Sequence, residues 1–494
     1  MANSLHQIFP EANGLTVKNV SEFNPSKITS LFFWFLFFGN LGLLIYYFPS
    51  VPTWEFKNII RINGFTLIIW ATVTFFSAIV SSYASSYLTG FKFHNRFTRL
   101  CIGFTFSVML FIASNHVASL LFAWLAMGFF MSRLIGVNTE WGEAREAAKF
   151  SQKYFLAGSL FLSIGLLVLA YQTNSFMLTE ITQNINSQPY WILFVASVCI
   201  IIAAIIQSAI YPFHKWLLSA MTAPTPASAL MHAGFVNGSG VLLTLFASVL
   251  FASNTLNILL IVGGVTAIVA QFTKLIQVNV KQKLGCSTIA QMGFMIMQCG
   301  LGFFNAAIVH LILHGFYKAY LFLSAGENLS YSEPEKPSQI QITLLQAIIV
   351  LIYGIIGAYL FTTFTGKGTE LNSSVFLTLI VAITVGQVTY NIVKNKSLSA
   401  VQKAVLPPVL FFIGIGMYAL MYNAITQLMS DMVFSANPIP LSFIQVAFAI
   451  VFLLGFFMMK IGLYRKIPWL YVKLLNDSQP QKNTVLLFKT KSLS

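Results

Sequence analysis

Three ionisable side chains in the segment VHLILHGFYKAYLFLSAGEN are the residues best suited to chemistry. His310, His314 and Lys318 follow one another at intervals of four. That spacing places all three on one face of a helix, as a polar stripe in an otherwise apolar segment. Imidazoles titrate near neutral pH and pass protons along water chains, and a buried lysine changes charge when its neighbours change. The stripe indicates proton transfer, with a hydrogen-bonded structural stripe as the alternative.

A metal site is a further interpretation of the two histidines, because HxxxH is a spacing that zinc ligands use. No carboxylate accompanies the pair and no thiol is near in sequence, so we expect no metal in this chain. Glu327, nine residues beyond Lys318, belongs either to the stripe or to a membrane interface.

The stretch YPFHKWLLSAMTAPTPASALMHAGFVNGSG is the second candidate. Its prolines and histidines are Pro212, Pro224, Pro226, His214 and His232. Because proline lacks a backbone donor, a helix here is interrupted, and in a membrane its freed carbonyls need cover from protein or water. Secondary transporters build ion sites at such breaks. We interpret the stretch as a broken helix beside an ion path, with a proline-kinked structural helix as the alternative.

Further basic residues lie in or beside apolar segments. Lys281 and Lys283 precede CSTIAQMGFM, either as interfacial anchors or, for Lys281, as an inward-facing addition to the histidine stripe. Arg133 shares a segment with His116 and lies near its predicted cytoplasmic end, where we expect the guanidinium to snorkel to the interface.

Composition places these groups in a membrane. Hydrophobic residues make up 57% and charged residues 8% of 494, and the mean hydropathy is +0.78. A soluble chain of this length cannot bury so much apolar surface. The apolar runs are long and continuous, which predicts an all-α polytopic membrane protein and excludes a β-barrel. Four scattered cysteines, Cys101, Cys199, Cys286 and Cys299, lack ligand spacing and are predicted to be core residues.

We predict about fourteen transmembrane helices, one of them broken. Their ranges are 29–48, 63–88, 100–115, 117–137, 154–171, 190–211, 213–252 (the broken one), 256–273, 284–301, 303–328, 340–364, 373–393, 404–425 and 440–461. They form a transmembrane domain over 29–461, between an N-terminal segment 1–28 and a C-terminal tail 462–494. The last stretch, from Asp477, is predicted to be a flexible tail.

The net charge of +15 does not indicate nucleic-acid binding, because the basic residues form short clusters between the spans. Such clusters reflect the orientation of the chain in the membrane. Every second connection is basic: Lys92/Arg96/Arg99, Arg145/Lys149/Lys153, Lys274/Lys281/Lys283, Lys394/Lys396/Lys403 and the tail from Lys460. The connections 172–189, around Asn254 and 426–439 hold no lysine or arginine. The positive-inside rule then predicts that both termini are cytoplasmic, and no signal peptide is evident.

Three blocks carry a resemblance to a known superfamily: YPFHKWLLSAMTAPTPASALMHA, KQKLGCSTIAQMGFM and HLILHGFYKAYLF. In order and spacing they resemble PLHxWLPDAMxxPTPVSALxHA, DIKRxLAYSTxSQxGYM and HLxxHAFFKAxLFL of the antiporter-like subunits of respiratory complex I and Mrp sodium/proton antiporters. The similarity extends over residues 100–330. It implies ion translocation through broken helices and a central polar row, whose counterparts here are Lys281, His232, His310, His314 and Lys318.

Departures from that pattern indicate a shorter branch. Trp124 is followed by Leu125 where the superfamily has glutamate, Gln207 stands where it has lysine, and no second broken helix is recognisable after residue 340. Length, a diverged C-terminal third and the segment YRKIPWLYVKLLN resemble the DabB family, the membrane subunits of bacterial inorganic carbon pumps. That resemblance implies the inner membrane and a DabA-like zinc partner, with no cofactor in this chain.

The resulting hypothesis is an ion-conducting subunit, H+ or Na+, that energises uptake of CO2 or bicarbonate. Gln207, the break at Pro224 and Pro226, and His232 would line one half-channel. Lys281 with His310, His314 and Lys318 would form the relay to the other side. A subunit of a complex I-like oxidoreductase and a cation/proton antiporter subunit are the alternatives, and it stays open whether Arg133 replaces the missing charges.

Overall fold

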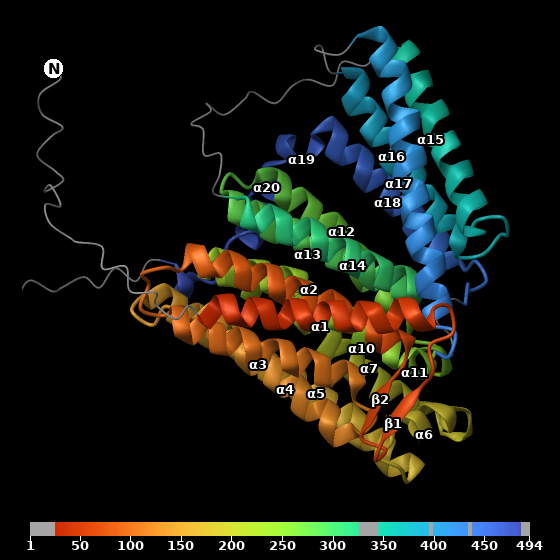
Figure 1. Cartoon of the computed structure of the whole chain (residues 1–494). Helices are drawn as coiled ribbons and strands as arrows, with labels where there is room; N and C mark the ends of the chain where they lie inside the picture. Colours follow the sequence, from red (N-terminus) through yellow and green to blue (C-terminus); the bar gives the residue numbers. More distant parts are fainter. Residues whose placement is uncertain (1–24, 326–343, 395–398, 433–436, 486–494) are drawn as a thin grey trace, which may run out of the picture.

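The computed structural model describes residues 25–325, 344–394, 399–432 and 437–485 (Figure 1). The long helices are α1 (Pro25–Tyr47), α2 (Gly64–Tyr87), α3 (His94–Ala113), α4 (Val117–Ile135), α5 (Gly142–Thr173), α7 (Tyr190–Gln207), α12 (Leu256–Ile276), α13 (Val280–Gly300), α14 (Phe304–Leu323), α15 (Leu344–Thr365), α16 (Ser374–Lys394), α17 (Ala400–Leu428) and α18 (Phe443–Ile461). The shorter elements are β1 (Trp54–Phe56), β2 (Ile60–Ile62), α6 (Leu178–Gln183), η1 (Ile185–Ser187), α8 (Lys215–Ser219), η2 (Ala220–Thr222), α9 (Thr225–Ala233), η3 (Phe235–Asn237), α10 (Gly238–Leu245), α11 (Ala247–Ala252), α19 (Leu463–Lys466), α20 (Pro468–Asp477) and η4 (Lys482–Thr484).

A helix, or for 213–252 a series of short helices, lies at every predicted span, so the all-α membrane fold is confirmed. Eleven described helical segments are long and apolar enough to cross a membrane, and parts of α16 and α18 are shorter apolar helices. α13 is absent from both classes because its sequence is more polar, yet it packs lengthwise between α12 and α14. α5 exceeds its predicted range because its first turns, with Glu143, Arg145 and Lys149, precede the apolar run.

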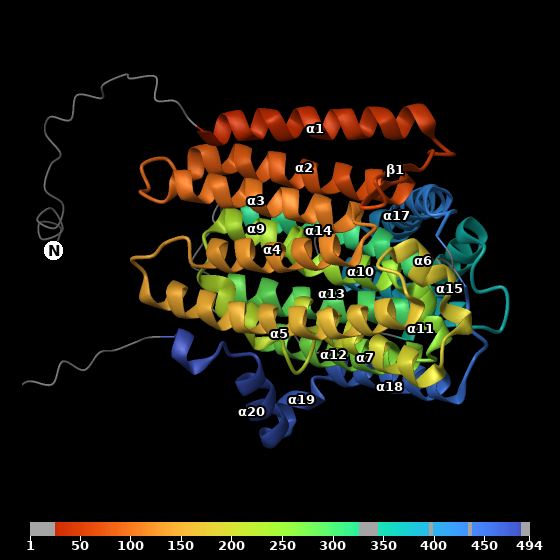
Figure 2. The same cartoon turned by 90° about the horizontal axis from the view of Figure 1, so that it is seen from below.

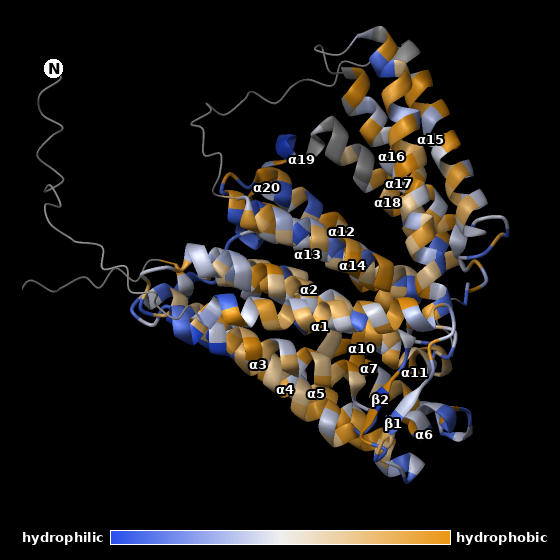
Figure 3. Ribbon diagram, viewed as in Figure 1, coloured by the Kyte–Doolittle hydropathy of each residue, from blue (hydrophilic) through white to orange (hydrophobic). Residues whose placement is uncertain are grey.

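Helices α1–α5 and α12–α14 run side by side between two ends of the molecule (Figure 2). We call one the basic end, where α2 meets α3, α4 meets α5 and α12 meets α13. The other, which carries the β1–β2 hairpin and α6, is the hairpin end. Apolar residues cover the middle of the helices and polar residues gather toward both ends (Figure 3), as a bilayer requires.

Lysine and arginine are not confined to the basic end. Lys57, Arg61 and Lys367 lie in connections at the hairpin end, so the positive-inside pattern is a bias and not a rule met throughout. Two of these exceptions are held by neighbours. Arg61 contacts Asp431 at 3.2 Å, and the Lys367 amine lies 3.6 Å from the centre of the Phe303 ring.

Helices α9 and α10 form the centre of the molecule. Every residue of α9 is buried, and α14 packs against both helices. The four cysteines are buried and unpaired, as predicted. Helices α15, α16 and α17 lean away from α12–α14 and approach them at the hairpin end (Figure 1), whereas α18 packs on α12.

Residues 463–485, which we call the C-terminal arm, dock onto the basic end. Tyr464 and Leu474 are buried in a small apolar cluster with Phe272 of α12. The carbonyl of Asp477 lies 2.8 Å from the His214 Nε2, and the amide of Gln481 donates to the Ser219 hydroxyl. The prediction of a flexible tail from Asp477 is therefore wrong for residues 477–485, because apolar anchors upstream hold this polar segment in place.

Docking of the arm is expected to weaken in acid. His214 lies in the connection before α8, outside the candidate spans of the structure. Burial lowers its pKa below the usual 6.5; Lys215 acts in the same direction, and Asp477 acts against it. Docking thus disfavours the protonated ring, so it should be strongest above pH 6.5 and weaken as the pH falls through that value. Hydrogen exchange of residues 474–484, corrected for intrinsic rates, measures this. Asn at position 214 retains a donor for Asp477, so His214→Asn should lose the pH dependence; an unchanged profile would contradict the assignment.

Candidate functional site

The predicted broken helix, 213–252, is interrupted at three places: before α9, between Gly234 and Asn237, and at Phe246 between α10 and α11. Pro224 caps α9, and Pro226 lies in its first turn. A backbone N–H in the first turn has no partner within the helix, so a proline there costs no hydrogen bond. These prolines therefore begin a helix near the basic end. Pro212 lies in the connection before α8. The second interruption, Gly234 to Asn237, falls at the centre of the candidate span Thr225–Leu245. The central break is therefore at glycine and asparagine, not at the prolines that the sequence interpretation favoured.

Side chains from neighbouring positions satisfy the carbonyls at this central break. Gln207 Nε2 donates to the Phe235 carbonyl at 3.3 Å, and the Ser208 hydroxyl donates to that of Val236 at 2.7 Å. The Asn237 amide donates to the Ala233 carbonyl at 2.8 Å and reaches that of Leu311 on α14 at 3.4 Å. An interrupted helix is stable in a membrane only with such partners. Ser208 and Asn237 were missed from the sequence, where their one signal is polarity inside an apolar run.

Replacing Gln207 with leucine is expected to destabilise the protein by about 1–3 kcal/mol, because the buried Phe235 carbonyl loses its donor. Thermal unfolding in detergent measures the change. Lysine, the superfamily residue at this position, can still donate a hydrogen bond, so Gln207→Lys should be less destabilising with respect to that carbonyl. Equal stability of the leucine variant and the parent would show that this hydrogen bond contributes nothing.

The predicted stripe lies on α14 and faces the centre of the molecule. Lys318 is fully buried, and its amine donates to the Leu284 carbonyl of α13 at 3.1 Å. The rings of His310 and His314 are nearly parallel, with centroids 6.0 Å apart. His314 is buried and His310 is half-buried. The three side chains thus follow one another along the helix, with Lys318 toward the basic end.

His232 and Lys281 extend this stripe toward the basic end. We call the five side chains together the histidine row, or the row: Lys281, His232, Lys318, His314 and His310. The His232 ring, in the last turn of α9, stacks on Phe322 of α14 at 4.2 Å, close enough to Lys318 and Lys281 to feel both charges. Lys281 points inward, and its amine donates to the Ala223 carbonyl at 3.0 Å, next to the proline at the start of α9. Lys283 is exposed. Of the two interpretations of these lysines, the inward one fits Lys281 and the anchor fits Lys283.

The row has the groups that a proton relay needs. Both ring nitrogens of His232 and His314, and Nε2 of His310, are buried without a hydrogen-bond partner. Buried polar atoms of this kind bind water or exchange protons with it. No ion pair between described residues involves Lys281 or Lys318, and no group of three or more described His, Cys, Asp or Glu side chains could hold a metal. The arrangement can move a positive charge as a proton through imidazole and amine groups.

The remaining candidates lie away from the row. Arg133 is exposed, with its guanidinium 5.2 Å from the Phe129 ring, as expected for a snorkelling residue. His116 caps α4 by accepting from the Ala118 amide, which is a structural role. Leu125 is 41% exposed, so a carboxylate at this position would face outward. His214 belongs to the docking site of the C-terminal arm, and Glu327 lies outside the described residues.

A groove of about 300 Å³ lies beside His310, between α13/α14 and α15–α17. Its walls are mostly aliphatic and aromatic, with Phe361, Leu377 and Ile380 among them. Gln298, Thr384 and Tyr418 are the polar residues that line it together with His310, and the Gln298 Oε1 is buried without a partner. On this side, the row therefore meets an apolar wall.

Comparisons with known proteins agree with the geometry. The family model for "NADH:quinone oxidoreductase/Mrp antiporter, TM" matches residues 114–392. A probable inorganic carbon transporter subunit DabB of Bacillus subtilis is 30% identical over 71% of this chain and 75% of that protein. The Bacillus anthracis DabB is 34% identical over 60% of this chain, but the match spans only 59% of that protein. The chain belongs to the DabB family.

Solved structures support the same fold. The chain superposes on a chain of the Mrp complex from Dietzia sp. DQ12-45-1b with a TM-score of 0.64 and 22% identity, covering 91% of this chain and 56% of that one. As a member of the DabB family, it is a multi-pass membrane protein of the antiporter-like superfamily. The row on α9, α13 and α14 lies entirely within the residues that the family model matches.

Proposed function

We propose that this chain is the proton-conducting subunit of an inorganic carbon pump in the bacterial inner membrane, with both termini cytoplasmic. The observation that carries this proposal is Lys318, a fully buried lysine that is bonded only to a backbone carbonyl among the described residues and lies one helical turn from His314 on α14. An ionisable group at membrane depth is costly and marks an ion pathway.

The chemistry of the row favours a proton over a sodium ion. Its side chains are amines and imidazoles, which are positively charged when protonated and so repel a metal cation. A sodium ion would instead need several oxygen ligands. Protons can occupy the row one group at a time, with the carbonyls of Ala223 and Leu284 stabilising the charged lysines.

The names of the relatives support an inorganic carbon substrate and a partner subunit. Relatives are named as inorganic carbon transporter subunits, which supports uptake of CO2 or bicarbonate by the complex that contains this chain. We assign the carbon chemistry to a DabA-like zinc partner, an assignment that the membership of this chain in the DabB family supports. In this scheme the chain supplies the ion flux that makes uptake energetically favourable.

Co-purification tests this proposal. The tagged chain is extracted in mild detergent, and its bound proteins and metals are identified by mass spectrometry and elemental analysis. We expect one large zinc-containing partner. Co-purified iron–sulfur subunits would indicate instead that the chain is a subunit of a respiratory complex, in agreement with its similarity to NADH-quinone oxidoreductase subunit L of Rickettsia bellii. Other antiporter-like subunits without zinc would indicate a cation/proton antiporter.

A further inference from the structure

A polar cavity of about 150 Å³ lies at the hairpin end, remote from the basic end and its C-terminal arm. Its walls come from segments far apart in sequence: β2 and the start of α2, the end of α3, α6, the α10–α11 half of the broken helix, and the residues after α17. This volume has room for several water molecules at about 30 Å³ each.

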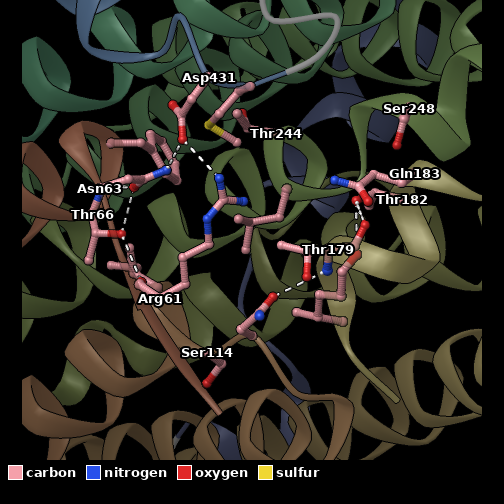
Figure 4. A pocket seen from close by; sticks show the side chains of 16 residues that line it. Arg61, Asn63, Thr66, Ser114, Thr179, Thr182, Gln183, Thr244, Ser248 and Asp431 are labelled. Carbon is pink, nitrogen blue, oxygen red and sulfur yellow. Dashed lines mark hydrogen bonds and ion pairs between the residues drawn. The ribbon is translucent and has the colours of Figure 1, made fainter. Parts of the chain in front are cut away.

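An ion pair lies in the wall of this cavity. Asp431 accepts from Asn63 Nδ2 at 2.7 Å and from Arg61 Nη2 at 3.2 Å (Figure 4). Arg61 has a second, weaker carboxylate neighbour, because its Nε lies 3.6 Å from Glu55. The Arg61 guanidinium can therefore shift from the Asp431 carboxylate to the Glu55 carboxylate. After such a shift, Asp431 can bind another cation.

Two donors in the cavity have no hydrogen-bond partner, which indicates that it holds water. They are the Asn115 Nδ2 and the Arg61 Nε, and Asn115 is only 2% exposed. The Asn115 side chain is fixed in place, since its Oδ1 accepts from the Thr179 amide and its backbone bonds Ile59 and Leu178. A buried, fixed amide with free donor hydrogens requires water or another oxygen acceptor in front of it.

The broken helix connects this cavity to the histidine row. Thr244 and Ser248 line the cavity, and Asn237 lies two turns away along α10, at a distance of about 10 Å. The Asn237 Oδ1 is buried without a partner, and its amide reaches the carbonyl of Leu311, the residue after His310. Polar side chains therefore run from the cavity to the backbone of α14 next to His310, whereas the groove on the other side of His310 is mostly apolar.

We propose that this cavity is the outer mouth of the ion path, that a proton binds Asp431 there, and that the Arg61–Asp431 pair closes it. This assignment rests on the proposed proton-conducting function. Binding of a proton to the carboxylate neutralises it and releases Arg61 toward Glu55. The proton then passes along Ser248, Thr244 and Asn237 to the histidine row.

Transport kinetics test the role of Asp431. The complex is reconstituted with its partner, and carbon uptake is measured while the external proton or sodium concentration is varied separately. Asp431→Asn should raise the apparent KM for the coupling ion at least about fivefold, because the charge that attracts it is lost. Glu180 is an exposed carboxylate on α6 outside the cavity wall, so Glu180→Gln is the matched control and should leave KM unchanged.

Thiol labelling supplies a readout that does not depend on transport. The four native cysteines are buried, so a cysteine introduced by Thr182→Cys or Ser248→Cys reports access to the cavity. A membrane-impermeant thiosulfonate should label both from the outside, and Arg61→Gln should speed labelling of Ser248→Cys. Lys283→Cys, exposed at the basic end, should react only from the inside.

The outcomes separate the two proposals. An unchanged KM in Asp431→Asn, or labelling of Ser248→Cys from the same side as Lys283→Cys, would overturn the assignment of the mouth and leave the pump intact. Parent complexes whose carbon uptake responds to neither ion would overturn the ion-conducting function itself.

Discussion

Replacing Lys318 with methionine is expected to lower ion-driven carbon uptake by about a hundredfold, the scale on which a positioned proton-transfer group acts. Lys318 is fully buried and lies one helical turn beyond His314 on α14. Methionine has a similar length and no charge to bury, so folding should survive. Uptake of labelled bicarbonate by cells, together with the amount of protein and partner in the membrane, measures the effect.

Two variants accompany this experiment. Lys318→Gln retains a donor for the Leu284 carbonyl and removes the charge, so uptake should fall as it does with methionine. Recovery of uptake with glutamine would mean that Lys318 only satisfies that carbonyl. Lys283→Met removes an exposed lysine of the neighbouring helix and should change uptake less than about twofold, as surface substitutions do.

Replacing His232 with phenylalanine is expected to lower uptake by about tenfold or more, because both ring nitrogens next to Lys318 and Lys281 are lost. Phenylalanine retains the stacking on Phe322. It also removes two buried nitrogens that have no partner, so thermal stability should be unchanged or higher. Uptake and thermal unfolding measured on the same preparation separate transport from folding.

His116→Asn is the control for this histidine. Asparagine is a good N-cap, so the variant keeps an acceptor for the Ala118 amide at the start of α4, far from the row. It should transport like the parent. If His232→Phe also transported like the parent, His232 would be a packing residue and the relay would have to begin at Lys318.

The membrane fold could be predicted because hydropathy is a local property. A span needs about twenty apolar residues in a row, so α1–α5 and α12–α18 can be located from the sequence without knowing what they pack against. The stripe of His310, His314 and Lys318 is equally local, since helical periodicity alone places residues four apart on one face.

The site could be predicted only in part, because several of its contacts join different helices. The inward turn of Lys281 depends on the Ala223 carbonyl, which α9 presents to the start of α13. The central break depends on donors supplied by Gln207 and Ser208 at the end of α7. Proline is a strong local signal, and it drew attention to Pro224 and Pro226 rather than to Gly234 and Asn237.

By itself, the sequence determined the class of protein, the spans, the family and the helical face that carries the histidines, since each depends on residue types at fixed spacing along one segment. Tertiary structure alone decided which segments that are far apart in the sequence come into contact. The C-terminal arm meets His214 across 263 residues, and Arg61 meets Asp431 across 370. Such pairings follow from the packing of whole helices, which places distant side chains together and has no signature in the local pattern of either partner.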